Sequence, residues 1–169
     1  KILSKNFDQR INFTEKKINK ISKKEFNIGS TKQLGEIMYN DLKISALKKT
    51  KKGSFATSAS VLEDLAFKGN EFPRLVLDWR QISKLKNTYS DSLQEHINPK
   101  TKRVHTSFLL AATTTGRLAS SDPNLQNIPI KSDDGKEIRK SFVAEKGNLL
   151  ISADYNQIEM RILADLADV

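Results

Sequence analysis

Residues 149–163 read LLISADYNQIEMRIL, an apolar run that ends in a carboxylate and passes into a helical pattern. Leu149 to Ala153 predicts a buried strand, and Gln157 to Ala167 predicts a helix. Asp154 then falls at the carboxyl end of the strand, where one or two protein oxygens and a substrate phosphate can hold a hard cation. The N-cap of the following helix is an equally good interpretation of Asp154. Glu159, a turn and a half further on, suits a position behind the metal ligands or facing the substrate better than a shared metal.

The segment before it is unusually polar. Residues 113–129 read TTTGRLASSDPNLQNIP, with many hydroxyls and amides, one arginine and few apolar anchors. Such donors contact phosphates and minor-groove acceptors, although composition alone also fits a polar surface loop. In residues 131–136, KSDDGK, the acidic residues have turn spacing. We expect a surface turn there rather than a calcium loop.

The spacing of apolar residues changes at Pro99, from a helical repeat before it to alternation after it. Alternation from Arg103 to Phe108 predicts a strand, and Phe142 to Ala144 predicts a short one. Before Pro99, a long helix is expected with Pro73 in its first turn and Asn98 near its end. Its apolar face consists of Leu75, Val76, Trp79, Ile82, Leu85, Tyr89 and Leu93.

The N-terminal third is also helical by pattern. Residues 1–27 predict an amphipathic helix that ends at Gly29, and Ser30 or Thr31 can cap a second helix. Residues 48–54 predict an exposed basic loop, after which Thr57 and Ser58 can cap a short third helix. Residues 1–96 are therefore predicted to be helical and the remainder mixed, which gives an α+β fold.

Charge and composition narrow the class of protein. The 169 residues carry 29 Lys and Arg against 20 Asp and Glu, and the whole surplus of +9 lies in residues 1–60. A basic region of this kind favours a polyanion as the partner, most commonly nucleic acid, although a solvated lysine-rich helix face gives the same count.

The rest of the composition excludes several kinds of site. Because the sequence has no cysteine and two histidines, a disulfide scaffold, a thiol nucleophile and Cys- or His-rich metal sites are excluded. The longest apolar runs are far below the roughly 18 to 20 residues of a membrane helix. The chain begins at Lys1, and we expect it to be a piece of a longer protein.

Four segments together resemble the family A DNA polymerases. Residues 154–163, DYNQIEMRIL, resemble motif A of that family, which reads D-Y-S-Q-I-E-L-R-[IV]-[LM] in bacterial members. Residues 115–129 are similar to its T-G-R-L-S-S-x-D-P-N-L-Q-N-I-P motif. Residues 26–34, FNIGSTKQL, resemble its thumb signature, and residues 83–107 contain segments similar to the helix and strand that join thumb to palm. The motifs occur in the order of the family and cover nearly the whole chain.

The resemblance implies a right-hand polymerase fold. Residues 1–96 would form the helical thumb, which grips DNA. Residues 97–169 would form the first part of an antiparallel-sheet palm, without the fingers subdomain and the rest of the palm. The resemblance also implies DNA contacts at the thumb tip, along the thumb and near the primer terminus. These residues are Lys51, Lys52, Thr57, Ser58, Lys84, Lys86, Arg117, Asn124, Gln126 and Asn127.

The resemblance further implies a catalytic site with two Mg²⁺ ions. Asp154 would bridge the ions and the carbonyl of Tyr155 would complete one shell. Glu159 would close the pocket against a ribose 2′-hydroxyl, and Tyr155, Gln157 and Glu159 would contact the incoming nucleotide. Asp154, Glu159 and Arg117 are therefore the expected catalytic residues.

The implied function is DNA-directed DNA synthesis in replication and repair. The expected partners are primer-template DNA and deoxynucleoside triphosphates, without a membrane. The expected form is a monomer in the bacterial cytoplasm, associated with the nucleoid. Because only one of the two palm carboxylates is in the sequence, the isolated chain is expected to bind DNA without extending it. A non-catalytic duplex-DNA-binding module is the alternative.

The sequence departs from the bacterial pattern at a few positions. Thr31 replaces the usual Pro, Asn156 the usual Ser and Lys102 the usual Gly. The pair Leu109-Leu110 stands where polar residues are common, and it either alters a DNA-facing strand or packs against the protein. Asp154, Arg117 and Glu159 keep the residues of the family pattern.

Overall fold

The computed structural model describes residues 2–44 and 55–168 and divides the chain into two compact units, Lys1–Arg139 and Lys140–Val169. The predicted boundary between thumb and palm, at residue 96, does not coincide with the boundary between these two units, and it stays a prediction. None of the described helices is long and apolar enough to cross a membrane.

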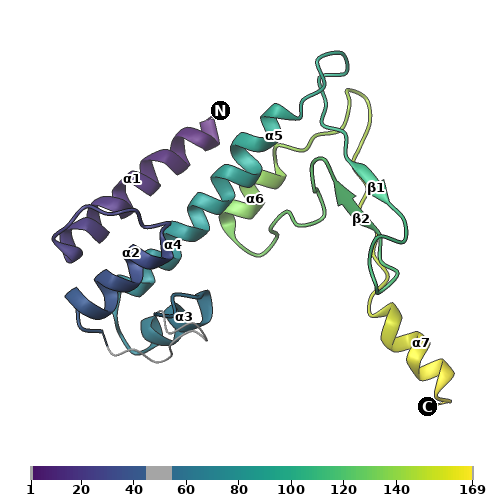
Figure 1. Ribbon diagram of the computed structural model, residues 1–169. Coiled ribbons are helices and arrows are strands. Elements are labelled where there is room, and N and C mark those ends of the chain that lie inside the picture. The colour runs from purple at the N-terminus through teal and green to yellow at the C-terminus, as the bar shows by residue number, and fades with distance from the viewer. Residues whose placement is uncertain (1, 45–54, 169) are drawn as a thin grey trace. The chain divides into compact units, whose positions relative to one another are not determined.

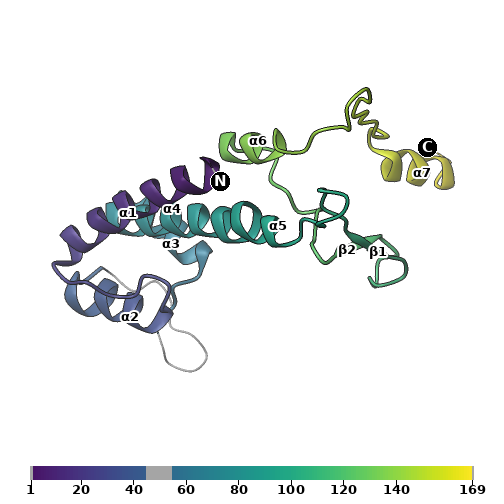
Figure 2. The same cartoon turned by 90° about the horizontal axis from the view of Figure 1, so that it is seen from above.

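Two long helices form the body of the first unit. Helix α1 (Ile2–Ser22) lies alongside α4 (Glu71–Leu85), and α4 runs on through the π-helical segment η2 (Lys86–Asp91) into α5 (Ser92–Glu95) (Figures 1 and 2). Pro73 is in the first turn of α4, as predicted, where its missing N–H is not required. The long helix ends before Asn98, also as predicted.

Shorter helices complete the core at one end of this pair. Helix α2 (Thr31–Glu36) continues into the π-helical segment η1 (Ile37–Asp41), and α3 (Ala59–Phe67) packs on α4. The buried core residues are Ile18, Ile28, Leu34, Ile37, Met38, Tyr39, Val61, Leu62, Leu65, Phe72, Leu75 and Val76. Most of them are apolar positions that repeat with helical spacing, which is why the pattern predicted these helices.

Two helix boundaries test the capping expectations. The predicted cap of α2 is confirmed, because the Ser30 side chain accepts a hydrogen bond from the Gln33 backbone N–H. The predicted end of the first helix at Gly29 is wrong. Helix α1 ends at Ser22, since Lys23 adopts a left-handed φ of 55° and the Ser22 hydroxyl donates to the Lys24 carbonyl at 2.7 Å. The segment that follows turns back and buries Ile28 in the core.

A small antiparallel hairpin follows the helices, which confirms the α+β class. Strand β1 (Ser107–Leu109) pairs with β2 (Ala119–Ser121), with Phe108 opposite Ser120. The predicted strand from Arg103 is largely wrong, because before Ser107 only Val104 makes a β-bridge, to Ile97. In the turn before it, Lys102 has a φ of 57°, a left-handed conformation that suits the glycine usual at this position.

The expected surface turn at 131–136 is also wrong. Residues Asp133–Arg139 form helix α6, and the Ser132 hydroxyl accepts a hydrogen bond from the Gly135 N–H at 3.1 Å. This capping interaction explains why the acidic residues begin a helix, since negative side chains are favourable in a first helical turn.

The second unit contains helix α7 (Ile158–Leu166), close to its predicted bounds. The strands expected at 142–144 and 149–153 are wrong, because both segments lack regular structure. Leu149 and Ile151 are 88% and 91% exposed. An apolar strand needs a paired neighbour and a covered face, and among the described residues no strand pairs with this segment.

Helix α3 allows a matched test of the core. We expect Leu62→Ala to lower the free energy of unfolding by about 2 to 5 kcal/mol, because the fully buried side chain would leave a cavity. Phe67→Ala on the same helix removes a side chain that is 95% exposed and should change stability by less than about 0.5 kcal/mol. Urea unfolding of the protein that contains this chain measures both, and equal losses would contradict the assigned core.

Candidate nucleic-acid site

The predicted DNA-binding lysines have different surroundings. Lys84 is exposed on α4. The Lys86 side chain is only 18% exposed and makes ion pairs with Asp91 at 2.5 Å and Asp8 at 3.3 Å. Lys86 must therefore exchange protein carboxylates for a phosphate if it binds DNA. Lys51 and Lys52 lie outside the described residues.

Thr57 and Ser58 precede helix α3. Ser58 is the N-cap, and its hydroxyl lies 3.1 Å from that of Ser60 rather than bonding a backbone N–H of the helix. Thr57 is buried, and its carbonyl accepts a hydrogen bond from Arg80 at 2.7 Å. The exposed Ser58 hydroxyl and the helix N-terminus are thus suited to an anion, whereas the Thr57 side chain faces the protein.

The four polar candidates near the hairpin are all exposed. Arg117 is in the loop between β1 and β2, where the Thr113 hydroxyl donates to its carbonyl at 2.8 Å. Asn124, Gln126 and Asn127 lie in the turn after β2. The Gln126 side-chain amide donates to the Leu118 carbonyl at 3.0 Å, which brings the turn next to the Arg117 segment. The structure therefore places these candidates in two neighbouring segments of the first unit.

Two residues that the sequence analysis did not select for this site hold the same turn. The Tyr89 hydroxyl of η2 donates to the Asn127 carbonyl, and Arg139 of α6 donates to the carbonyls of Ile128 and Pro129. Tyr89 was expected only as an apolar-face residue of the long helix. No local sequence pattern marks Arg139, because its side chain reaches these carbonyls only when α6 has formed.

The candidates for chemistry lie in the second unit. Asp154, Tyr155, Gln157 and Glu159 are all exposed there. Gln157, with a left-handed φ of 52°, is the N-cap of α7. The alternative interpretation of Asp154 as the N-cap is therefore wrong, because Asp154 precedes that position by three residues.

The donors around Asp154 fit Mg²⁺ in kind. A carboxylate and a neighbouring backbone carbonyl are hard oxygen ligands, and Mg²⁺ is commonly held by one or two carboxylates, water and substrate phosphates. Within residues 2–44 and 55–168, no group of three or more His, Cys, Asp or Glu side chains could hold a metal ion. Asp154 and Tyr155 would therefore be part of a metal site rather than a whole one.

The ion pairs of η2 set the electrostatics beside Tyr89. The hydrogen bond from Lys86, with a second from Ser4, lowers the pKa of Asp91 below its usual value. The same hydrogen bond to Asp91 raises the pKa of Lys86. Burial raises the pKa of Tyr89, so its hydroxyl stays protonated at neutral pH and can donate to Asn127.

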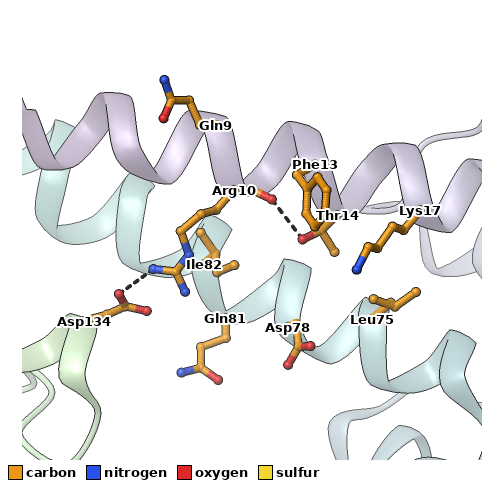
Figure 3. Close-up of a pocket in the computed structure, with 10 residues that line it drawn as sticks. All are labelled: Gln9, Arg10, Phe13, Thr14, Lys17, Leu75, Asp78, Gln81, Ile82 and Asp134. Carbon is orange, nitrogen blue, oxygen red and sulfur yellow. Dashed lines mark hydrogen bonds and ion pairs between the residues drawn. The ribbon is translucent and has the colours of Figure 1, made fainter.

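A groove of about 540 Å³ lies between α1, α4 and α6 (Figure 3). None of its lining residues was predicted as a site residue. Its floor includes Leu75 and Ile82, and Arg10 on α1 reaches across to Asp134 on α6. With two basic and two acidic side chains in its lining, the groove has no strong preference for one charge of ligand.

Comparison with known proteins defines the class. The family model described as DNA polymerase family A matches residues 1–169, and the chain belongs to this family. It is 54% identical over 155 residues to DNA polymerase I of Rhizobium leguminosarum, covering 92% of the chain and 15% of that protein. It is 48% identical over 166 residues to DNA polymerase I of Pseudomonas aeruginosa, covering 98% of the chain and 18% of that protein. The chain therefore spans less than a fifth of the length of these relatives.

A solved structure agrees with the sequence relatives. The POL domain of Pol1 from M. smegmatis, in complex with DNA primer-template and dNTP, superposes with a TM-score of 0.85 at 37% identity. The match covers 98% of this chain and 29% of that one. It confirms the expected family and fold class.

The structure tests one of the two interpretations of Leu109-Leu110, packing against the protein. Leu109 is 44% exposed and Leu110 is 83% exposed, so neither is packed away within the first unit. The pair is left on the surface of the hairpin that carries Arg117 in its loop.

The low pKa of Asp91 leads to a pH prediction. A carboxyl group with a lowered pKa in the folded state stabilises the protein above its unfolded pKa of about 3.9, and this contribution disappears as the pH falls through the folded pKa. Asp91→Asn should therefore lower the urea midpoint at pH 7, and the difference from wild type should shrink toward pH 3.5. A difference that is independent of pH would contradict the ion pair as its cause.

Proposed function

We propose that the protein containing this chain is a DNA-directed DNA polymerase that adds deoxynucleotides to a primer 3′-end in replication and repair. The observation that carries the proposal is the match of the whole chain to DNA polymerase family A. The complex of the similar M. smegmatis domain with primer-template and dNTP supports the same substrates here. We further propose that the protein is a monomer in the bacterial cytoplasm, at the nucleoid.

The first unit would bind the primer-template duplex. Lys51, Lys52 and Lys84, the Ser58 end of α3 and, after release from its carboxylates, Lys86 would neutralise phosphates. Phosphate contacts give affinity without sequence preference, and that affinity depends strongly on salt. This property suits an enzyme that copies any template.

The hairpin and the turn after it would contact the minor groove. Arg117, Asn124, Gln126 and Asn127 are exposed, and the bond from Gln126 to the Leu118 carbonyl joins the turn to the Arg117 segment and leaves the second N–H of the Gln126 amide for DNA. Purine N3 and pyrimidine O2 present acceptors at similar places in every correct base pair. Such donors can therefore test the shape of a pair at the primer terminus without distinguishing its sequence.

The second unit would supply part of the chemical site. The Asp154 carboxylate and the Tyr155 carbonyl would hold Mg²⁺, which stabilises the attacking and leaving oxygens when it is bound. Tyr155 and Gln157 would contact the incoming nucleotide. Glu159 would exclude a ribose 2′-hydroxyl and so favour deoxynucleotides.

Residues 1–169 by themselves should bind duplex DNA without extending a primer. Asp154 is the single metal-binding carboxylate proposed here, and the described residues form no complete metal cluster. Extension by this isolated segment would contradict the proposed division of the site.

Primer extension by the complete protein tests the function. We expect Asp154→Asn to lower the rate of extension with Mg²⁺ and deoxynucleotides by several orders of magnitude, while duplex affinity stays within about threefold, because a carboxylate ligand is lost without any phosphate contact. Asp165→Asn is the matched control, since it neutralises another exposed carboxylate of the same unit. If Asp154→Asn extends as well as wild type, Asp154 is not a catalytic metal ligand. If the wild-type protein binds duplex without extending it, the protein is a non-catalytic DNA-binding module.

Salt dependence tests the phosphate contacts. Lys84→Ala should weaken binding equally for different duplex sequences and reduce the slope of log affinity against log salt by about 1. Lys146→Ala, an exposed lysine without an assigned contact, is the control. Fluorescence anisotropy over a salt series measures the slope, and an unchanged slope for Lys84→Ala would remove that residue from the interface.

A further inference from the structure

Three consecutive backbone carbonyls after β2 are held by side chains from two other elements. The Asn127 carbonyl accepts from the Tyr89 hydroxyl of η2. The Ile128 and Pro129 carbonyls accept from the Arg139 guanidinium of α6, at 2.9 Å and 3.0 Å. This turn has no regular secondary structure, so these bonds replace the ladder that would hold it in a strand or helix.

The Tyr89 side of this support is anchored by contacts with α1. Tyr89 is buried in η2, and η2 is joined to α1 by polar contacts. Lys86 is 3.3 Å from Asp8, and the Ser4 hydroxyl donates to Asp91 at 2.7 Å. A rotation or shift of η2 that moved the Tyr89 hydroxyl would break these contacts, which favours one position of that hydroxyl.

The Arg139 side depends on a close approach of α6 to the turn. A Cβ atom at Gly135 would lie 2.7 Å from the Pro129 carbonyl oxygen and 2.8 Å from the Pro129 Cβ. Only glycine permits this distance without a backbone shift. Ile138 is buried on the same helix, and Arg10 joins Asp134 to α1 (Figure 3).

The support determines which groups of the turn remain for a ligand. The carbonyls of Asn127, Ile128 and Pro129 are used by Tyr89 and Arg139. The Asn124 side-chain oxygen accepts from the Gln126 backbone N–H and the Gln126 side-chain amide gives one N–H to the Leu118 carbonyl, so the Asn124 amide nitrogen, the second N–H of the Gln126 amide and the exposed Asn127 side chain remain for a ligand. A turn whose backbone is already fixed loses little conformational freedom when those amides bind DNA. The affinity for DNA and the alignment of the amides with the groove therefore both increase.

We propose that Tyr89 and Arg139 are positioning residues that hold the amides of 124–127 in register with the minor groove of the primer terminus. The inference rests on the proposed function and adds to it the residues that align the contact. Both residues act through the backbone carbonyls and need no contact with DNA.

A double-mutant cycle tests the proposal in the complete protein. Tyr89→Phe removes only the hydroxyl and should lower the extension rate constant by roughly 2- to 10-fold, as for the loss of one hydrogen bond, with a smaller change in duplex affinity. In an Asn127→Ala background, Tyr89→Phe should have a smaller effect than in the wild type, because one of the side chains that it aligns, the one next to the carbonyl it holds, is already gone.

Two further variants separate alignment from stability. Tyr39→Phe is the matched control, because the buried Tyr39 hydroxyl also donates to a carbonyl, that of Ala56, but in the core away from this turn. It should cost similar stability in a thermal melt and leave extension unchanged. Arg139→Lys keeps the charge but cannot reproduce the two-carbonyl fork, so it should lower extension in the same way as Tyr89→Phe.

The outcomes are distinguishable. Extension losses of Tyr89→Phe and Asn127→Ala that simply add, or a loss in Tyr39→Phe as large as in Tyr89→Phe, would overturn the positioning role and leave the polymerase function intact. An Asn127→Ala variant that extends as wild type would also overturn it, because the turn would then have no minor-groove contact to align. A wild-type protein that does not extend primers would overturn the proposed function itself.

Discussion

The packing of α1 against α4 is the contact on which the first unit depends. Phe7 and Ile18 on α1 and Val76 on α4 are fully or almost fully buried, and burial of such side chains stabilises a fold by about 1.5 to 3 kcal/mol each. The same pairing brings Asp8 beside Lys86 and Ser4 beside Asp91, and it places Arg10 where it reaches Asp134 of α6. Both supports of the turn after β2, Tyr89 and Arg139, are therefore set by a helix pair that contains none of the proposed minor-groove donors. A substitution in this apolar contact would act on the candidate site without touching DNA.

Local signals in the sequence were sufficient for most of the helices, although they missed α6 and the end of α1. The apolar spacing, Pro73 and the Ser30 cap predicted α2, α3, the long helix and α7 because helix formation depends on neighbours three and four residues away. The strand predictions at 142–144 and 149–153 failed for the opposite reason, since a strand is completed by partners distant in sequence. The segment 131–136 was misread because its acidic residues suit both a turn and a first helical turn, and the choice depends on Ser132 and on contact with Pro129.

The candidate site was predicted in part. Motif resemblance located Asp154, Arg117 and the 124–127 amides, and the structure shows that all of these are exposed. It could not indicate that Lys86 is engaged by Asp8 and Asp91, because those carboxylates come from different turns of two helices. Nor could it indicate Tyr89 and Arg139, whose hydrogen bonds go to backbone carbonyls, groups that every residue carries and that leave no pattern in a sequence. Leu109 and Leu110 remain exposed on the hairpin, and nothing in the structure explains why they are apolar.

In the proposed function, the turn after β2 faces the minor groove of the primer terminus. The most direct measurement is single-nucleotide extension of primers whose terminal purine carries C–H in place of N3, which removes one minor-groove acceptor and leaves base pairing intact. Our account predicts that this change slows the wild-type protein by about tenfold and has little further effect on Asn127→Ala, since the two changes remove the same hydrogen bond. Equal slowing of both proteins, or no slowing of the wild type, would contradict it.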